Sequence, residues 1–425
     1  MSIILTLIVF SVLVFVHEFG HFIMAKKNGI CVVEFSIGMG PRLFSFDKGE
    51  TKYSWKLVPF GGSCQMLGED EDVEDNERAF NNKSVWARMV VLAAGPVFNF
   101  FLAFVLSVIV IGSVGYDPCI VIEPDDGTAV EEAGLEAGDV ITEYNGKNIV
   151  ISRDLFLQEY MYPVTKDDVT IKYKRDGKEY TATVTPKEVY SMGISFYANE
   201  KPAEVLSVVN GSAIEEAGVK AGDVITSING EKIEKGKDIS DYLDENPLTS
   251  ENIELEFKRD DKTIKKSVEP RITYSIGLKY NTGRVKTSAL GVLRYSFTEM
   301  RYDSESVIKS LWMLITGKIG AEAVSGPVGI ANIVDDAYEQ TKSQGAFEVF
   351  LNMANLTVLF SVNLGVVNLI PFPALDGGRL LFLVVEAIRR KPVPKEKEAV
   401  VHFVGMAILM VLMVFILFND IKKII

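Results

Sequence analysis

Two of the three histidines in this chain lie four residues apart in an apolar segment, within the sequence VHEFGHF. On a helix, His17 and His21 share one face and can hold one metal ion. Glu18 lies beside them and can act as the general base for a metal-bound water. An ionisable group in an apolar membrane segment costs roughly 2.5–3.5 kcal/mol. A purely structural role is therefore a poor explanation of this histidine pair.

A hydrolytic zinc ion typically takes three protein ligands and keeps the fourth position for water. The best third ligand is Asp376, in the sequence NLIPFPALDGGRLLF. His402 is the alternative, but it lies at the mouth of the last apolar run, beside a basic loop, where an interfacial role explains it better. If all four apolar runs span a membrane, the first and third run in the same direction. His17, His21 and Asp376 can then meet at a similar depth.

The elements that must position these residues are membrane helices. The 425-residue chain is 48% hydrophobic with a mean hydropathy of +0.18, which is high for a soluble protein. Its apolar residues gather in four runs, at 2–25, 88–114, 346–370 and 399–418. Each run has about the 20 residues that a membrane-spanning helix needs. The first run lacks a basic leading region and a small-residue cleavage site, so we expect a membrane span there and not a signal peptide.

Basic residues in the short loops predict the orientation. They are Lys26, Lys27, Lys83, Arg88, Arg389, Arg390, Lys391, Lys395 and Lys397. With four spans they all lie on one side, which should be the cytoplasm. Both termini and the long middle region then face outward, and the metal site lies toward the cytoplasmic side. The net charge of −13, in part from an acidic run at 69–77, makes nucleic acid a poor candidate partner.

The middle region contains a repeat. GTAVEEAGLEAGDVITEYNGKNI begins at Gly127 and GSAIEEAGVKAGDVITSINGEKI begins at Gly211, with 15 of 23 positions identical. A repeat that stays in register indicates two copies of one domain. Each copy predicts a short helix, then a strand that ends in an Asn-Gly turn, then a hairpin. The motif resembles the PDZ domains of bacterial proteases, which implies either peptide binding by strand addition or a rigid spacer that limits access.

Two asparagines and two prolines complete the set of candidate site residues. Asn99, in GPVFN, and Asn368 could donate hydrogen bonds to a developing oxyanion or to the substrate backbone. Hydrogen bonds that hold the spans together are the alternative for both. Pro371 and Pro373 interrupt the helix ahead of Asp376, and irregular backbone at this depth is tolerated where water enters.

These motifs together resemble the site-2 protease family of intramembrane metalloproteases. They are HEFGH at 17–21, GPVFN at 95–99 and NLIPFPALDG at 368–377. With two PDZ-like domains between the second and third spans, the chain is similar to the bacterial regulator-of-sigma-E protease type of this family. The resemblance covers nearly the whole chain. It implies one zinc ion on His17, His21 and Asp376, with Glu18 as the catalytic base.

The resemblance also implies a biological setting. The setting is the bacterial cytoplasmic (inner) membrane, where such enzymes act in regulated intramembrane proteolysis. The implied substrates are single-span membrane proteins, namely anti-sigma factors already cut by an upstream site-1 protease and signal-peptide remnants. Asn99, Asn368, Pro371 and Pro373 are then substrate-handling residues.

Two further segments fit proteolysis inside a membrane. Residues 31–67 contain strand-like runs, and an exposed strand edge near the zinc could hold an unwound substrate in extended form. Residues 289–315 place apolar side chains at mostly helical spacing, which predicts an amphipathic helix on the outer membrane surface. These side chains belong to Leu290, Leu293, Phe297, Met300, Val307, Ile308, Leu311 and Trp312. Packing against the PDZ-like domains is the alternative for this helix.

The predicted fold is an α-helical polytopic membrane protein with four transmembrane helices, a membrane-associated β region and two extracytoplasmic PDZ-like α+β domains. The segments are 1–28 (first span), 29–68 (β-hairpin region), 69–85 (acidic loop), 86–114 (second span), 115–196 and 197–283 (PDZ-like domains), 287–318 (surface helix), 346–388 (third span with LDG) and 398–418 (fourth span). A non-catalytic PDZ scaffold and a metal transporter or sensor are the alternative functions. Glu18→Gln separates them, because it should abolish proteolysis only.

Overall fold

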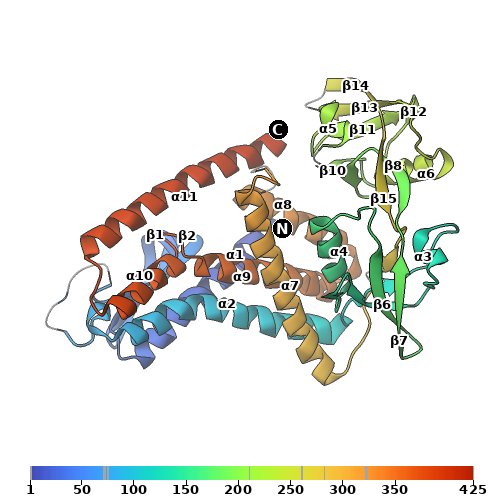
Figure 1. Cartoon of the computed structure of the whole chain (residues 1–425). Coiled ribbons are helices and arrows are strands. Elements are labelled where there is room, and N and C mark those ends of the chain that lie inside the picture. Colours follow the sequence, from blue (N-terminus) through green and yellow to red (C-terminus); the bar gives the residue numbers. More distant parts are fainter. Residues whose placement is uncertain are drawn as a thin grey trace. The chain divides into compact units, whose positions relative to one another are not determined.

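The computed structural model describes residues 2–69, 73, 76–209, 211–259, 262–281, 283–320 and 324–424. The chain divides into two compact units, Met1–Tyr116 with Arg284–Ile425, and Asp117–Gly283. Long helices dominate the first unit and short strands the second (Figure 1). The predicted acidic loop falls partly outside the described residues, and its described part contains the short helix η1 (Phe80–Asn82).

In the part of the chain that the structure describes, four helices are long and apolar enough to span a membrane, in agreement with the four predicted runs. They are α1 (Ser2–Lys27), α2 (Val85–Val114), α9 (Ala346–Leu369) and α11 (Lys395–Ile424). Many of their large apolar side chains are exposed, such as Phe101 on α2 and Val411 on α11. A helix is the expected spanning element because it satisfies its backbone polar groups internally.

Small residues bring α1, α2 and α9 close together. A β-carbon added to Gly20 of α1 would lie 2.9 Å from the carbonyl carbon of Ala94 on α2. One added to Gly365 of α9 would lie 3.1 Å from the ring of Phe100, also on α2. Gly20 thus lets the backbones of α1 and α2 approach each other, and Gly365 leaves room for the ring of Phe100, as is typical of helices packed in membranes. The packing places the histidine-bearing part of α1 against α2, with α9 on α2 as well.

The predicted strand region forms one long hairpin, β1 (Val32–Lys48) and β2 (Thr51–Met66). The second half of β1 pairs with residues 51–56 of β2. The first half pairs on one side with residues 52–55 and on the other with residues 62–66, so Ile37 lies opposite both Trp55 and Gly62. Among the described strands, only β1 pairs with residues 62–66. This segment is therefore an edge of the sheet, with backbone groups available to a further strand.

The predicted helix break after the third span is confirmed. Helix α9 ends at Leu369, and α10 (Asp376–Arg389) begins after a loop that contains Pro371 and Pro373. An ion pair between Arg88 of α2 and Glu386 of α10, with 2.5 Å between Nη2 and Oε1, joins the two helices. The predicted segment 346–388 thus consists of two helices and the loop that separates them.

Helix α7 (Ala289–Ile315) occupies the segment predicted as an amphipathic helix, and α8 (Pro327–Thr341) with the short η3 (Lys342–Gln344) follows it. In α7, the side chains of Met300, Val307 and Leu311 pack with apolar side chains of α2 and α9. Phe297 and Trp312 are exposed. The apolar face is therefore shared between protein and surroundings, and a location at the outer membrane surface stays a prediction.

The two copies of the repeat form matching elements in the second unit. The first copy contains β3 (Ile120–Val121), α3 (Ala129–Glu132), β4 (Val140–Tyr144), β5 (Lys147–Asn148), α4 (Ser152–Met161), β6 (Val169–Arg175), β7 (Lys178–Val184), β8 (Lys187–Ser191) and β9 (Ile194–Phe196). The second contains β10 (Val205–Val208), α5 (Ala213–Glu216), β11 (Val224–Ile228), β12 (Glu231–Lys232), α6 (Gly236–Glu245), β13 (Ile253–Arg259), β14 (Lys262–Val268), β15 (Arg271–Ser275) and β16 (Tyr280–Asn281). The predicted turns are present: Asn145 and Gly146 both have positive φ, 47° and 78°.

The cores of the two copies are nested. One core combines buried residues between 119 and 184 with Ile276, and the other lies entirely between 192 and 268. Strand β16 pairs with β3, and β15 pairs with β8 as a two-stranded ribbon between the cores. The predicted domains 115–196 and 197–283 follow the sequence repeat, but the cores do not, because the end of the second copy completes the first core.

Candidate active site

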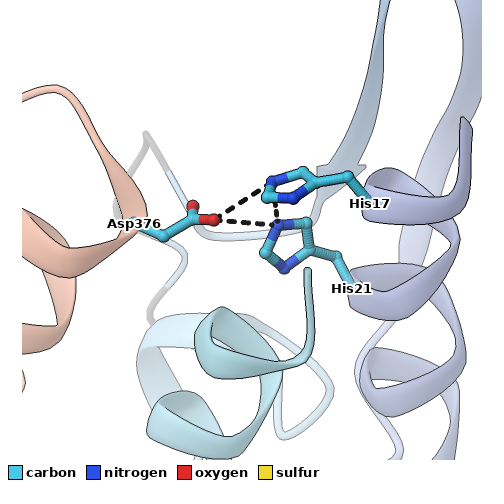
Figure 2. A group of neighbouring side chains, drawn as sticks. All are labelled: His17, His21 and Asp376. Atoms are coloured by element: carbon cyan, nitrogen blue, oxygen red, sulfur yellow. Dashed lines mark hydrogen bonds and ion pairs between the residues drawn. The ribbon is translucent and has the colours of Figure 1, made fainter. Parts of the chain in front are cut away.

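Three side chains from distant parts of the sequence meet in the first unit (Figure 2). Nε2 of His17 and Nε2 of His21 lie 3.2 Å apart. Oδ2 of Asp376 lies 3.1 Å from the first nitrogen and 3.4 Å from the second. The two histidines come from the C-terminal half of α1, and Asp376 is the first residue of α10. The sequence prediction that these three residues meet therefore agrees with the structure.

The spacing of these atoms fits a tetrahedral zinc ion. Zinc–ligand distances near 2.0–2.1 Å and tetrahedral angles place ligand atoms about 3.3 Å apart. The three separations, 3.1 to 3.4 Å, lie around that value. Two imidazoles and one carboxylate are a ligand set that zinc prefers, and three ligands leave a fourth position for water.

Both histidines are oriented through their other ring nitrogen. Nδ1 of His21 is 2.9 Å from the carbonyl oxygen of Val91, and Nδ1 of His17 is 3.0 Å from the side-chain amide of Asn99. Metal-ligating histidines typically donate Nδ1–H to such a partner, which fixes the tautomer and the ring plane. When His17 donates, Asn99 must present its oxygen, which is the alternative assignment of the same amide.

Asn99 therefore contacts a histidine of the site, a role that the sequence did not predict. Its side chain is fully buried, and its backbone oxygen accepts a hydrogen bond of 2.8 Å from the hydroxyl of Ser361 on α9. Gly95, one turn earlier on α2, leaves the room that the imidazoles need. A β-carbon there would lie 2.7 Å from Cε1 of His21 and 2.8 Å from Cε1 of His17. The GPVFN motif thus shapes the histidine pocket from α2.

Glu18 is half-buried and lies next to the edge of the sheet. A β-carbon added to Gly62 of β2 would lie 3.1 Å from Cγ of Glu18. The open edge formed by residues 62–66 therefore passes directly beside the predicted general base. A peptide bound to this edge as an extra strand would run close to that carboxylate.

The loop ahead of Asp376 is tightly packed on glycines. A β-carbon on Gly378 would lie 2.8 Å from the carbonyl carbon of Phe372, so the start of α10 lies directly under the loop. Asn368 is half-buried at the end of α9, and its side chain makes no hydrogen bond to the described residues. Its amide is therefore available to a bound peptide. Pro371 is exposed and Pro373 half-buried.

His402 does not join the two other histidines. Its Nδ1 instead accepts a hydrogen bond of 2.8 Å from the backbone N–H of Ala374. Among the described residues, the group that could hold a metal ion consists of His17, His21 and Asp376. The interfacial role suggested for His402 omitted this contact with the loop, since a pairing across distant segments leaves no local pattern in the sequence.

Comparison with known proteins gives the family. The sequence profile of Peptidase family M50 matches residues 5–412. The chain belongs to peptidase family M50. This M50 peptidase is 34% identical over 448 residues to the regulator of sigma-W protease RasP of Bacillus subtilis, with 99% of this chain and 98% of the relative covered. It is 33% identical over 449 residues to the zinc metalloprotease RasP of Bacillus licheniformis, with 99% of each chain covered.

A third relative agrees with these two. The zinc metalloprotease RasP of Geobacillus kaustophilus is 32% identical over 451 residues, with 99% of this chain and 98% of the relative covered. The predicted membership of the site-2 proteases and the predicted zinc metalloprotease activity are thereby confirmed. Among solved structures, the HtrA3 PDZ domain with a phage-derived ligand matches 21% of this M50 peptidase and 91% of that domain, at 18% identity and a TM-score of 0.18.

Proposed function

We propose that this M50 peptidase hydrolyses peptide bonds of single-span membrane proteins at one zinc ion held by His17, His21 and Asp376. The observation that carries the proposal is the triangle of ligand atoms, 3.1 to 3.4 Å on a side, formed between α1 and the start of α10. Both histidines belong to a helix that is long and apolar enough to span a membrane. The chemistry is therefore expected within or beside the bilayer.

When bound, zinc lowers the pKa of a water molecule and polarises the scissile carbonyl. Glu18 accepts the proton of that water as the C–O bond forms. It then gives the proton to the leaving amine as the C–N bond breaks. Asn99 keeps His17 in the tautomer that presents Nε2 to the metal, and the carbonyl of Val91 does the same for His21. Asn368, whose side chain makes no hydrogen bond to the described residues, donates to the substrate backbone.

The sheet edge presents the substrate. A peptide bond in a helix is shielded by its own hydrogen bonds, so the substrate must be unwound before attack. Residues 62–66 offer backbone partners beside Glu18, and we assign to them the extended form of the substrate. Pro371 and Pro373 keep the loop ahead of Asp376 irregular, and irregular backbone at this depth is tolerated where the water that hydrolysis needs can enter.

The proposed substrates and partners are those that the resemblance to site-2 proteases implies, and the proposed orientation is the one that the basic residues of the short loops predict. RasP of Bacillus subtilis is named the regulator of sigma-W protease. We assign to this chain anti-sigma factors trimmed by a site-1 protease, and signal-peptide remnants, as substrates in a bacterial cytoplasmic membrane. The repeats would face outward and admit only substrates without a bulky outer domain. Excision of both repeats should then relax this selectivity without abolishing cleavage.

The test uses the purified full-length protein in liposomes with a tagged single-span substrate whose outer domain is removed. Wild type, Glu18→Gln and Asp376→Asn are compared for cleavage and for bound zinc. We expect cleavage by wild type alone, with zinc retained by Glu18→Gln and lost by Asp376→Asn. A wild-type protein without zinc, or cleavage by Glu18→Gln, would contradict the proposal.

A further inference from the structure

The loop that leads into Asp376 contains a residue in an unfavourable backbone conformation. Ala374 has φ = +75°, in the left-handed region that residues with a β-carbon rarely adopt. It lies two residues ahead of Asp376, where α10 begins. Such a conformation persists only where surrounding contacts hold it, and it is often found beside a functional site.

The contact that holds Ala374 comes from α11. Its backbone N–H donates to Nδ1 of His402 over 2.8 Å. One turn further along α11, Gly405 lies against the same loop, since a β-carbon there would be 2.7 Å from the carbonyl oxygen of Pro373. His402 also lies beside the ring of Phe382 on α10, with 5.5 Å between ring centroids. The imidazole is thus wedged between the loop and α10.

The position of Asp376 depends on this loop. Glycines at the start of α10 pack directly beneath it, so a shift of the loop moves the first residue of the helix. Gly377 meets the backbone of Leu369, and Gly378 meets that of Phe372. The carboxylate must stay within a few tenths of an ångström of its place to keep its distances to the two histidine nitrogens. A hydrogen bond that fixes Ala374 therefore acts on the carboxylate of Asp376.

We propose that His402 is a positioning residue, which holds Asp376 in its metal-binding place through the backbone of Ala374. The inference rests on the proposed role of Asp376 as a zinc ligand. His402 itself touches neither the metal ligands nor the reacting atoms. It stabilises the left-handed turn at Ala374, and the fourth span thereby contributes to a site formed by the other helices.

The test measures zinc release from the full-length protein in detergent, with a chromophoric chelator and no substrate. His402→Asn keeps an acceptor close to the place of Nδ1, whereas His402→Gln moves the acceptor to the place of Nε2. We expect zinc release from His402→Asn within twofold of wild type. We expect release from His402→Gln to be five- to tenfold faster, equivalent to about 1–1.4 kcal/mol. Phe403→Leu, an exposed neighbour on α11, is the control and should match wild type.

A second substitution separates positioning from simple packing. Glycine adopts positive φ readily, so Ala374→Gly should remove the need for His402. In the His402→Gln background it should restore zinc release to within twofold of wild type. Equal release from the Asn and Gln variants, or no rescue by Ala374→Gly, would overturn the inference. If Asp376→Asn itself retained zinc normally, the proposed ligand set would fail, and this inference with it.

Discussion

Oδ2 of Asp376 lies 3.1 Å from Nε2 of His17, although the two residues come from opposite ends of the chain. The contact requires α1 and the start of α10 to be fixed relative to each other, and α2 contacts both of them. Glycines of α2 and α1 bring those helices together, and the Arg88–Glu386 pair joins α2 to α10. A site assembled in this way should be sensitive to changes in α2 that touch no substrate.

Substitution of Asp376 should affect metal binding before anything else. Asp376→Asn keeps the shape of the side chain but removes its charge. Loss of a residue that only orients a ligand typically weakens metal binding 10–100-fold. Loss of a direct ligand should cost more, so we expect zinc binding to weaken by at least about 100-fold. Competition with a chelator of known affinity measures this. Glu18→Gln, which leaves the three ligands in place, should bind zinc like wild type. Similar weakening in both variants would mean that Glu18 is also a ligand.

Substitution of Asn99 should weaken zinc binding even when no substrate is present. Asn99→Ala removes the acceptor for Nδ1–H of His17 and should weaken zinc binding about 10–100-fold. Asn99→Asp retains an acceptor oxygen and should stay within a few-fold of wild type. If Asn99→Ala binds zinc normally and only raises KM, Asn99 instead handles the substrate, as the resemblance to site-2 proteases implies.

Gly95 should not tolerate a side chain. Gly95→Ala places a methyl group against the rings of His17 and His21, which must move, so zinc content and cleavage should both be lost. Gly112 lies on the same helix, where an added β-carbon meets only Val292, at 4.0 Å. Gly112→Ala should be neutral or stabilising, since alanine favours the helix by up to about 1 kcal/mol. Zinc analysis and thermal unfolding of both variants give the comparison.

The sheet edge should matter for turnover and not for zinc. Proline removes a backbone donor, and successive donors along a strand point to opposite edges. Proline placed singly at positions 62 to 65 should therefore give two classes of variant. Where the donor faces β1, the sheet is destabilised; where it faces outward, zinc content is kept and turnover falls at least tenfold. Alanine at the same positions is the control, and full turnover in all zinc-loaded proline variants would exclude substrate binding at this edge.

The second unit should lose stability as the pH rises from about 4.5 to 7. Burial raises the pKa of Glu159 on α4 from 4.5 to about 7, although a hydrogen bond of 3.2 Å from the hydroxyl of Tyr280 favours the ionised form. The folded protein therefore binds this proton more tightly than the unfolded chain does. The resulting stability is fully present below pH 4.5 and is lost as the pH rises through 7. It amounts to at most about 3 kcal/mol.

Urea unfolding of the fragment 117–283 at several pH values checks this prediction, since both cores lie within that fragment. Glu159→Gln should remove most of the pH dependence between 4.5 and 7. A wild-type fragment with constant stability across this range would show that the carboxyl titrates as if exposed.

The sequence indicated the candidate metal-binding residues, but not the contacts that hold them in place. HEFGH and LDG were recognisable because ionisable residues in apolar runs are rare, and the four spans followed from hydropathy alone. The contact of Asn99 with His17 and that of Ala374 with His402 join residues from different helices. No local pattern encodes such pairs, since they depend on how the helices pack.

The absence of a local pattern also explains why the sequence did not predict how the cores of the two repeats are nested. Elements and turns followed from short-range signals such as Asn-Gly and Asp-Gly, and they are present. The nesting of the cores depends instead on which copy receives the strand β16. A repeat of constant register gives no information on that choice, because both copies carry similar apolar residues at the equivalent positions, such as Met192 and Ile276.

Because of the ribbon of β8 and β15, the residues that form the second core could be deleted from the chain without removing any part of the first core. Ser191 lies opposite Arg271 in this ribbon, so the chain leaves toward that core and returns from it at neighbouring points. A variant in which a short turn joins these two residues would lack the second core but would keep Ile276 and strand β16, which belong to the first core. Truncation at the sequence boundary between the copies would instead strip the first core of that strand. In the folded protein, the second copy is thus inserted into the first and does not simply follow it.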